Sequence, residues 1–460
     1  MASRFSALPL GTGEAFLLET QQGGKDWAIL VDSGNLDGGT PHPLVDALNK
    51  TAPKLRHIDI AIYTHRDTDH TKGFEHLADE WCGVGRTIGE FWLPGRWAAA
   101  MPKLLLDPAG LADSLWQGAA EASSRLVGPG GERTTHATEE SRIRDLAREL
   151  EIDSQFTDLE VADEAETSDS KYVDATDEDR DLRLSRTLGL TPEELVALDI
   201  SMEESDRPPS VVLDEIAAMV SRWVDPFWIE PPFVKQSISI RSIVLDAIAT
   251  AKTIAIISES AVRWRIPIRW FDFGQFEQTG RAKGGIKGFL EPMSAVELRH
   301  PPTRTSDVAL LFALRLSQQN VESLVFHRLE TQTEPGVIFL GDSRLHFGID
   351  KPTSAFPLPP SKPKRQILVT APHHGSRVND AAYGVIRSWI DVDKRSPIYV
   401  RNGGHHKQKI GAFLDEPFRC CAQCRLCGDE KIVRTVKLSS RAGQWSWNTK
   451  HVPKCKSREK

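Results

Sequence analysis

The sequence predicts an α/β protein with a mainly helical insertion and a C-terminal extension. Short apolar segments typical of strands alternate with turns and helices in segments 1–100 and 236–416. Segment 101–235 has mostly helical periodicity and no clear strand, and segment 417–460 is rich in cysteine and then in basic residues. We therefore expect one α/β domain built from two distant segments, a helical insertion between them, and a separate ending.

The composition is that of an ordinary soluble protein. Of 460 residues, 40% are hydrophobic and 26% are charged, and the formal net charge is −7. No apolar stretch approaches the roughly 20 residues that a membrane helix needs, and the first residues lack the basic and apolar pattern of a signal peptide. We expect a cytoplasmic protein that does not contact a membrane.

The expected strands follow from apolar runs bounded by turn residues. The first segment gives strands at 14–20, 27–34 and 57–63 and a helix at 42–50. The later segment gives a helix at 237–255 and strands at 266–273, 308–316, 322–330, 336–343, 365–376 and 396–404. The acidic run 158–181 is typical of a solvated linker or mobile loop, because it offers little to bury. It lacks the spacing of an EF-hand calcium loop.

The sequence THRDTDH, residues 64–70, directly follows an expected buried strand. It contains four side chains that can bind a metal ion: His65, Asp67, Asp69 and His70. Imidazole and carboxylate suit zinc, manganese or iron, and a high carboxylate content favours the harder metals. The alternative is that these are turn residues that satisfy nearby backbone donors.

Two later strands also end in metal-capable residues. Asp342 follows the apolar run GVIFLG, and His373 and His374 follow ILVTAP. Open α/β sheets hold their sites at the carboxyl ends of strands. Taken alone, Asp342 is more typical of a turn or a helix cap. The three strand ends together indicate a centre for two divalent metal ions.

These motifs, THRDTDH, FLGDS and APHHGS in this order, resemble the metallo-β-lactamase-fold hydrolases. The resemblance is to the ComEC-type branch, in which HxHxDH becomes HxDxDH, and it covers about residues 6–97 and 240–416. It implies an αββα sandwich, with two facing sheets, helices outside and the metal ions at one rim. Asp32, at the end of an early strand, would orient the motif loop; the alternative is a turn residue before Gly34.

The resemblance also implies the roles of the motif residues. His65 and Asp67 would hold one metal ion, Asp69 and His70 the other, and Asp342 would bridge them. His373 and His374 would complete the two ligand sets. His405 is a candidate substrate contact or late ligand, and His406 could exchange with it because the register of GGHHK is not fixed by the sequence.

Asp67 stands where many relatives have histidine, so manganese is credible beside zinc, and β-lactam hydrolysis is disfavoured. Two divalent cations suit hydrolysis at phosphorus. Asp69 and Asp342 are candidates for orienting or deprotonating water, and His405 for protonating the leaving group. Further candidate substrate contacts are Arg344, Ser376, Arg377, Arg401, Asn402 and His406. Other basic residues near the motifs are Arg66, Lys72, Lys407 and Lys409.

The expected function is that of a metal-dependent phosphodiesterase. We favour a nuclease acting on DNA or RNA over an esterase of small molecules. The ComEC-type relatives include predicted DNA nucleases, and basic side chains recognise phosphate. One alternative is hydrolysis of small phosphodiesters, cyclic nucleotides or other esters. Another is an effector subunit of a multi-component defence or DNA-processing system, inactive until a protein partner docks on the 101–235 insertion.

The C-terminal extension offers two further hypotheses. Cys421, Cys424 and Cys427 are spaced for a small structural zinc site, with Cys420 or Cys455 available as a fourth ligand; reduced free thiols and redox activity are the alternatives. Trp445 and Trp447 lie among basic residues, a combination that can bind single-stranded nucleic acid. The tryptophans could equally pack against the domain.

Overall fold

The computed structural model describes most of the 460 residues. It covers 2–10, 13–35, 43–126, 176–204, 207–222, 234–301, 306–315, 322–347, 356–390, 396–403, 410–422 and 435–447. Within these ranges the protein is α/β, and its strands form two mixed sheets packed face to face.

The larger sheet has nine strands in the order β15-β14-β1-β2-β3-β4-β5-β6-β8. Its strands are β1 (Arg4–Ala7), β2 (Phe16–Gln22), β3 (Lys25–Val31), β4 (His57–Ile62), β5 (Thr87–Pro94), β6 (Ile268–Asp272), β8 (Val296–Leu298), β14 (Val436–Arg441) and β15 (Gln444–Trp447). The strands β3 to β6 are parallel to one another, and their neighbours on both sides pair antiparallel. The β5–β6 pair joins the two distant segments of the chain in one sheet.

The smaller sheet has six strands in the order β13-β12-β11-β10-β9-β7. They are β7 (Leu290–Pro292), β9 (Phe326–Arg328), β10 (Val337–Phe339), β11 (Leu368–Thr370), β12 (Ile398–Arg401) and β13 (Arg419–Cys421). The strands β10 to β13 are parallel, so their carboxyl ends lie at one edge of the sheet.

The core between the sheets follows from the alternation of side chains along each strand. On β2, Phe16 and Leu18 face the smaller sheet, whereas Leu17 faces the outer helices. Phe326 and Phe339 belong to the same inner cluster from the other side. Both faces of the central strands are covered, so nearly every position on them is apolar. This explains the continuous apolar runs in the sequence.

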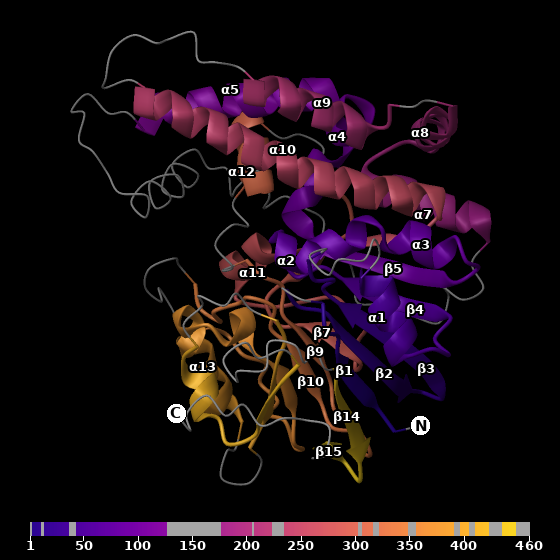
Figure 1. The fold of residues 1–460 in the computed structure, drawn as a ribbon, viewed down its shortest axis with the longest axis vertical. Coiled ribbons are helices and arrows are strands. Elements are labelled where there is room, and N and C mark those ends of the chain that lie inside the picture. Colours follow the sequence, from indigo (N-terminus) through magenta and orange to yellow (C-terminus); the bar gives the residue numbers. More distant parts are fainter. Residues whose placement is uncertain are drawn as a thin grey trace.

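Helices cover the outer face of each sheet (Figure 1). The apolar cluster on the outer side of the larger sheet includes residues of α1 (Pro43–Thr51), α3 (Leu77–Cys82), α4 (Met101–Leu106), α5 (Pro108–Leu126), α7 (Asp177–Leu188), α8 (Pro192–Glu204), α9 (Pro209–Arg222), α10 (Val234–Arg263) and α12 (Asp307–Arg315). Of these, α5, α9, α10 and α12 pack mainly against one another and form a helical layer. The smaller sheet carries α11 (Phe273–Thr279) and α13 (Asp380–Trp389). Helices of the 101–235 segment share one apolar cluster with the larger sheet.

Most expected elements are confirmed, but the strand predicted at 308–316 is wrong. Residues 308–315 belong to helix α12, which packs against α5 and α10 and is buried on nearly all sides. A short, wholly apolar run cannot distinguish a buried strand from a buried helix. The acidic run is corrected in part: residues 177–181 begin helix α7, which Thr176 caps, and 158–175 lie outside the described residues.

The ending of the chain is partly integrated into the sandwich. The β14–β15 hairpin extends the larger sheet beside β1. Trp445 is buried between the two sheets and donates its Nε1–H to the Gly336 carbonyl at 3.0 Å. Packing against the domain is therefore the observed role of Trp445. Among the described helices, none combines the length and apolar composition needed to cross a membrane.

Candidate metal centre

The motif residues of both sheets meet at one rim of the sandwich. His65 follows β4, and His70 lies on the short helix α2 (Thr68–Thr71). Asp342 follows β10 on the other sheet, yet its carboxylate oxygens lie 3.4 Å from His65 Nε2 and 3.1 Å from His70 Nε2. All three side chains are buried. The convergence predicted for these strand ends is thus observed.

A buried carboxylate behind the motif orients both imidazole rings. Asp32 accepts the Nδ1–H of His70 at 2.8 Å, which turns Nε2 of that ring toward Asp342. Asp32 also accepts the backbone N–H and the hydroxyl of Thr64. The Thr64 oxygen, having given its hydrogen to Asp32, accepts Nδ1–H of His65 at 2.9 Å. Such outer carboxylates fix the tautomer of metal-binding histidines.

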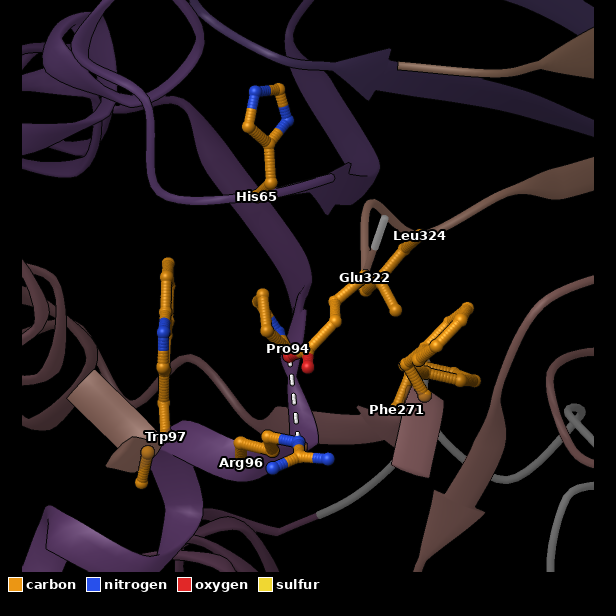
Figure 2. Close-up of a pocket in the computed structure, with 10 residues that line it drawn as sticks. His65, Pro94, Arg96, Trp97, Phe271, Glu322 and Leu324 are labelled. Atoms are coloured by element: carbon orange, nitrogen blue, oxygen red, sulfur yellow. Dashed lines mark ion pairs between the residues drawn. The ribbon is translucent and has the colours of Figure 1, made fainter. Parts of the chain in front are cut away.

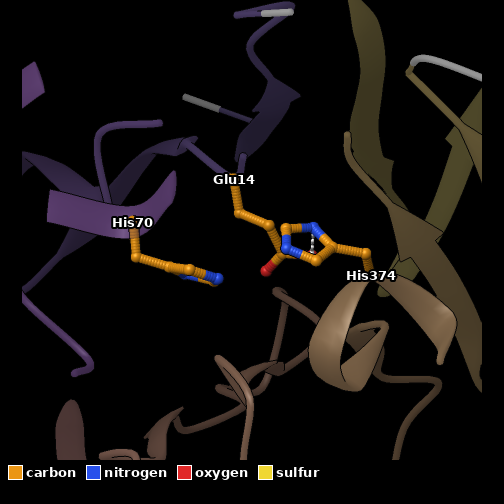
Figure 3. A group of neighbouring side chains, drawn as sticks. All are labelled: Glu14, His70 and His374. Atoms are coloured by element: carbon orange, nitrogen blue, oxygen red, sulfur yellow. Dashed lines mark ion pairs between the residues drawn. The ribbon is translucent and has the colours of Figure 1, made fainter. Parts of the chain in front are cut away.

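A second group lies beside the first and shares His70. Glu14, His70 and His374 are buried and bring their potential ligand atoms within 4.8 Å of one another. Figure 3 shows the Glu14 carboxylate between the two imidazole rings. His374 Nε2 lies 2.9 Å from Asp69 Oδ2, and its Nδ1–H donates to the Asn402 carbonyl at 2.9 Å. The side chain of Asp69 is 35% exposed, so this group reaches solvent.

The two adjacent histidines lie on strained backbone. His373 and His374 have φ angles of 48° and 51°, in the left-handed region that side chains with a Cβ rarely occupy. Each such residue costs about 1 kcal/mol or more. The strain turns the two rings in different directions, so that His374 meets Asp69 while His373 Nε2 lies 3.6 Å from Asp342 Oδ2.

A close backbone approach completes the rim. Gly13 has a φ of 99°, and a Cβ at this position would lie 2.0 Å from the carbonyl oxygen of Asp69. The next residue, Glu14, donates its backbone N–H to that same carbonyl at 3.0 Å. Glycine at position 13 therefore allows the first loop to carry Glu14 up to the motif.

The electrostatics of the first group favour bound cations. Burial and the neighbouring His70 lower the pKa of His65, but Asp342 and Asp67 outweigh them and raise the pKa to about 9. Burial likewise lowers the pKa of His70, and Asp342 and Asp32 raise it well above its usual value. Burial raises the pKa of Asp342, yet the surrounding histidines bring it well below the ordinary range.

The second group follows the same pattern. Burial lowers the pKa of His374, whereas Glu14 and Asp69 raise it to about 10. Burial raises the pKa of Asp69, but His374 and His70 lower it overall. Glu14 is the exception, since burial outweighs the nearby histidines and its pKa is raised. The carboxylates thus hold positive charge, as protons or as a metal ion, on the imidazoles.

These residues fit a metal ion. The Nε2 atoms of His65 and His70 are buried and make no hydrogen bond, although each lies close to the Asp342 carboxylate. Both oxygens of Glu14 are also buried without a hydrogen bond. Imidazole nitrogens and carboxylate oxygens that face one another without hydrogen-bond geometry are suited to sharing a cation. Asp67 Oδ2 lies 3.6 Å from His65 Nε2, beside the same group.

The predicted substrate residues lie in different environments. Arg377 is exposed and Arg344 is half-buried, both close in sequence to site residues. Arg401 is buried and donates to the His374 carbonyl at 2.5 Å. Asn402 is buried and donates to the carbonyls of residues 8 and 15 at 2.7 and 3.0 Å. Ser376 is buried next to the motif. Arg401 and Asn402 therefore support the His374 loop.

Several predicted residues lie outside the described residues: His405, His406, Cys424, Cys427 and Cys455. Cys421 is described and lies on β13, where its side chain is buried against the outer face of the smaller sheet. Its neighbour Cys420 points into the core between the sheets. The zinc site predicted for the cysteines stays a prediction.

A small pocket adjoins His65 from the side of the helical layer. Trp97 and Phe271 line it, together with an ion pair in which Arg96 Nε lies 3.4 Å from Glu322 Oε2. Figure 2 shows the ring of His65 pointing away from Arg96. The pocket therefore lies on the side of His65 opposite to the direction of its ring, and the ring itself faces the carboxylates of Asp67 and Asp342.

Glu14 is the site residue that the sequence analysis missed. The signal was available, because β2 and β3 pair antiparallel with Phe16 opposite Val31. That register brings the residues just before β2 next to those just after β3, where Asp32 lies. An acidic residue in a glycine-rich loop at this point could have been added to the site. No protein-family model matches the chain. A search of curated proteins also finds no match.

Proposed function

We propose that this protein is a metal-dependent phosphodiesterase with a metallo-β-lactamase-type αββα fold, and that its substrate is nucleic acid. The observation that carries the proposal is the convergence of His65, His70 and Asp342 with the Glu14, His70 and His374 group. The two groups lie side by side and both combine imidazole with carboxylate, which suits zinc or manganese; His70, whose Nδ1–H is donated to Asp32, offers its Nε2 to one ion. The face-to-face sheets with helices on both outer faces support the proposed fold.

The residues of the centre would have different roles in the reaction. Bound divalent cations would polarise a phosphoryl oxygen and lower the pKa of water, so that hydroxide is available near neutral pH. Asp342 and His65 would hold and orient one side of the centre, and His374 and Asp69 the other. Asp67 and Asp69 are the partly exposed carboxylates beside the histidines, so they are the ones that an attacking water can reach. Hydrolysis then adds water across one P–O bond.

An exposed arginine close in sequence to the site suits a phosphate substrate. Arg377 is exposed and follows His374 by three residues. Arginine matches phosphate oxygens in paired geometry. With Asp67 and Asp69 near the histidines, the centre is rich in carboxylate, which favours manganese as well as zinc.

A second candidate is hydrolysis of a small phosphodiester. It is favoured because three basic side chains near the motif already bind groups of the protein itself. Arg66 pairs with Asp246, Lys72 pairs with Glu75, and Arg401 binds a backbone carbonyl. These side chains contribute less to an extended basic groove than the sequence suggested, and a compact substrate needs fewer cations than a polymer.

The test uses the full chain, stripped of metal and reloaded with manganese or zinc. Labelled single- and double-stranded DNA and RNA serve as substrates, with bis-p-nitrophenyl phosphate as a generic diester and the Asp69→Ala/His70→Ala variant as control. Polymer cleavage that the variant lacks is expected. Cleavage of the small diester alone would favour the second candidate. No turnover of either substrate by metal-loaded protein would overturn both.

A further inference from the structure

Arg66 lies inside the metal motif, yet its side chain contacts the helical layer. Its Nη2 lies 3.0 Å from Asp246 Oδ2, and its Nη1 donates to Thr250 Oγ1 at 2.8 Å, both on α10. A third, longer contact joins Nη1 to the carbonyl of Leu314 on α12 at 3.4 Å. Only 8% of the side chain is exposed. Its charge is therefore satisfied by helices and not by a substrate.

The far end of the motif segment is joined to the same helix. Glu75 ends the 3₁₀ helix η1 (Lys72–Glu75) and accepts the hydroxyl of Thr253 at 3.0 Å. Its other oxygen pairs with Lys72 at 2.5 Å. Asp246, Thr250 and Thr253 are spaced by four and three residues, so they follow one face of α10. Helix α10 thus carries a row of polar side chains that contacts Arg66 within the motif and Glu75, five residues after it.

This row of polar side chains interrupts a helix that is otherwise held by apolar packing. Val244, Ala247 and Ile248 of α10 belong to the large cluster beneath the helical layer. Apolar contacts have little directional preference, so they alone allow a helix to shift along its axis. A buried guanidinium or carboxylate that loses its partner is left desolvated without a hydrogen bond, which is unfavourable. The Arg66 and Glu75 contacts therefore fix the position of α10 against the motif.

We propose that Arg66 is a positioning residue that couples helix α10 to the metal centre. It lies between two candidate ligands, His65 and Asp67, so a movement of its backbone moves both. The contact with Asp246 and Thr250 holds this backbone where the ligands converge. This inference rests on the proposed function in one respect, namely that the motif binds a divalent cation.

The experiment measures Mn²⁺ binding by the metal-stripped full chain, from the electron paramagnetic resonance signal of free aquated Mn²⁺. The variants are Arg66→Met, Asp246→Asn and the double substitution. We expect each single change to weaken binding at least fivefold. The affinity of the double variant for Mn²⁺ should equal that of the single variant with the lower affinity, because both changes remove the same contact.

A matched control is available on the neighbouring helix. Asp214 on α9 pairs with Lys252 of α10 at 2.6 Å and makes no contact with the motif. Asp214→Asn removes a carboxylate from the same helical layer, and its Mn²⁺ affinity should stay within twofold of the wild type. Circular dichroism verifies folding, and Arg66→Lys and Thr250→Val replace any variant that does not fold. Arg66→Lys, which keeps the charge, should recover part of the affinity.

The outcomes separate this inference from the proposed function. Folded Arg66 and Asp246 variants that bind Mn²⁺ as tightly as the wild type would overturn the positioning role and leave the metal centre intact. Losses that multiply in the double variant, or an equal loss in Asp214→Asn, would also overturn it. A wild-type protein that binds neither Mn²⁺ nor Zn²⁺ would overturn both proposals.

Discussion

At the scale of single residues, Asp32 controls both imidazoles of the motif. It binds His70 directly and His65 through the hydroxyl of Thr64. In asparagine an amide nitrogen, which is a donor, replaces one of the two oxygens. It would face either the Thr64 backbone N–H, now bound to Oδ1, or the Thr64 hydroxyl and the His70 Nδ1–H, both now bound to Oδ2. We predict that Asp32→Asn weakens Mn²⁺ binding about 10- to 100-fold, the usual effect of losing such a partner. Titration of metal-stripped protein with Mn²⁺ measures the change.

The control for this prediction is another buried carboxylate. Asp59 accepts the backbone N–H of Ala28 at 2.8 Å and pairs with Lys25, at the opposite end of β4 from the motif. Asp59→Asn should lower stability without changing the affinity for Mn²⁺. Equal affinities for the wild type and Asp32→Asn would show that the two rings are oriented without Asp32.

Protons and metal ions compete for the same imidazoles. Burial lowers the pKa of His65 and of His374, but nearby carboxylates raise the two values to about 9 and about 10. A cation must therefore displace protons at pH 7. We predict that Mn²⁺ affinity rises between pH 6.5 and 8.5, about tenfold per pH unit for each proton displaced. Calorimetry in buffers of different ionisation enthalpy measures the released protons, and a pH-independent affinity would contradict this.

At the scale of elements, β9 carries a buried histidine toward α13. His327 stacks edge-on against Trp389, and neither ring nitrogen makes a hydrogen bond. Burial and the adjacent Arg328 lower the pKa of His327 to about 3. The unfolded chain therefore binds a proton below about pH 6.5 that the folded protein excludes, so the free energy of unfolding decreases as the pH falls from 6.5 toward 3.

We predict that His327→Leu removes this pH dependence. Between pH 6 and 4, the stability of the wild type should fall relative to the variant by up to about 1.4 kcal/mol per pH unit. Urea unfolding at a series of pH values measures both proteins. The same substitution at the exposed His76 controls for the loss of an imidazole. Parallel curves for wild type and His327→Leu would mean that His327 is protonated in the folded state.

The elements also set how far the sequence could predict this protein. Strands β2, β3, β4 and β6 were predictable because runs of buried residues end at glycine or charged turns. Helix α12 was mistaken for a strand because its sides all face other helices, which removes the periodicity that marks a helix. The strand ends gave the motif histidines and Asp342. They did not give Glu14, which precedes a strand and is placed beside Asp32 by the β2–β3 register. The Arg66–Asp246 contact could not be predicted, because it depends on how distant segments pack.

At the scale of the whole molecule, the candidate centre lies between the two sheets. His65 and His70 belong to the larger sheet, and Asp342, His373 and His374 follow strands of the smaller one. A bound cation would therefore join the two halves of the sandwich at their rim. Unfolding separates these ligands, so the free energy of metal binding adds to the stability of the fold.

We predict that Mn²⁺ raises the midpoint of thermal unfolding in a concentration-dependent manner. At free Mn²⁺ one hundred times the dissociation constant, the gain is about 2.7 kcal/mol. Asp342→Asn should abolish the response, because this carboxylate faces His65, His70 and His373 at once. Asp380→Asn should keep it, since Asp380 belongs to the same half but accepts the N–H of residue 412. A midpoint unchanged by millimolar Mn²⁺ in the wild type would mean that the two halves are held together by side-chain packing alone.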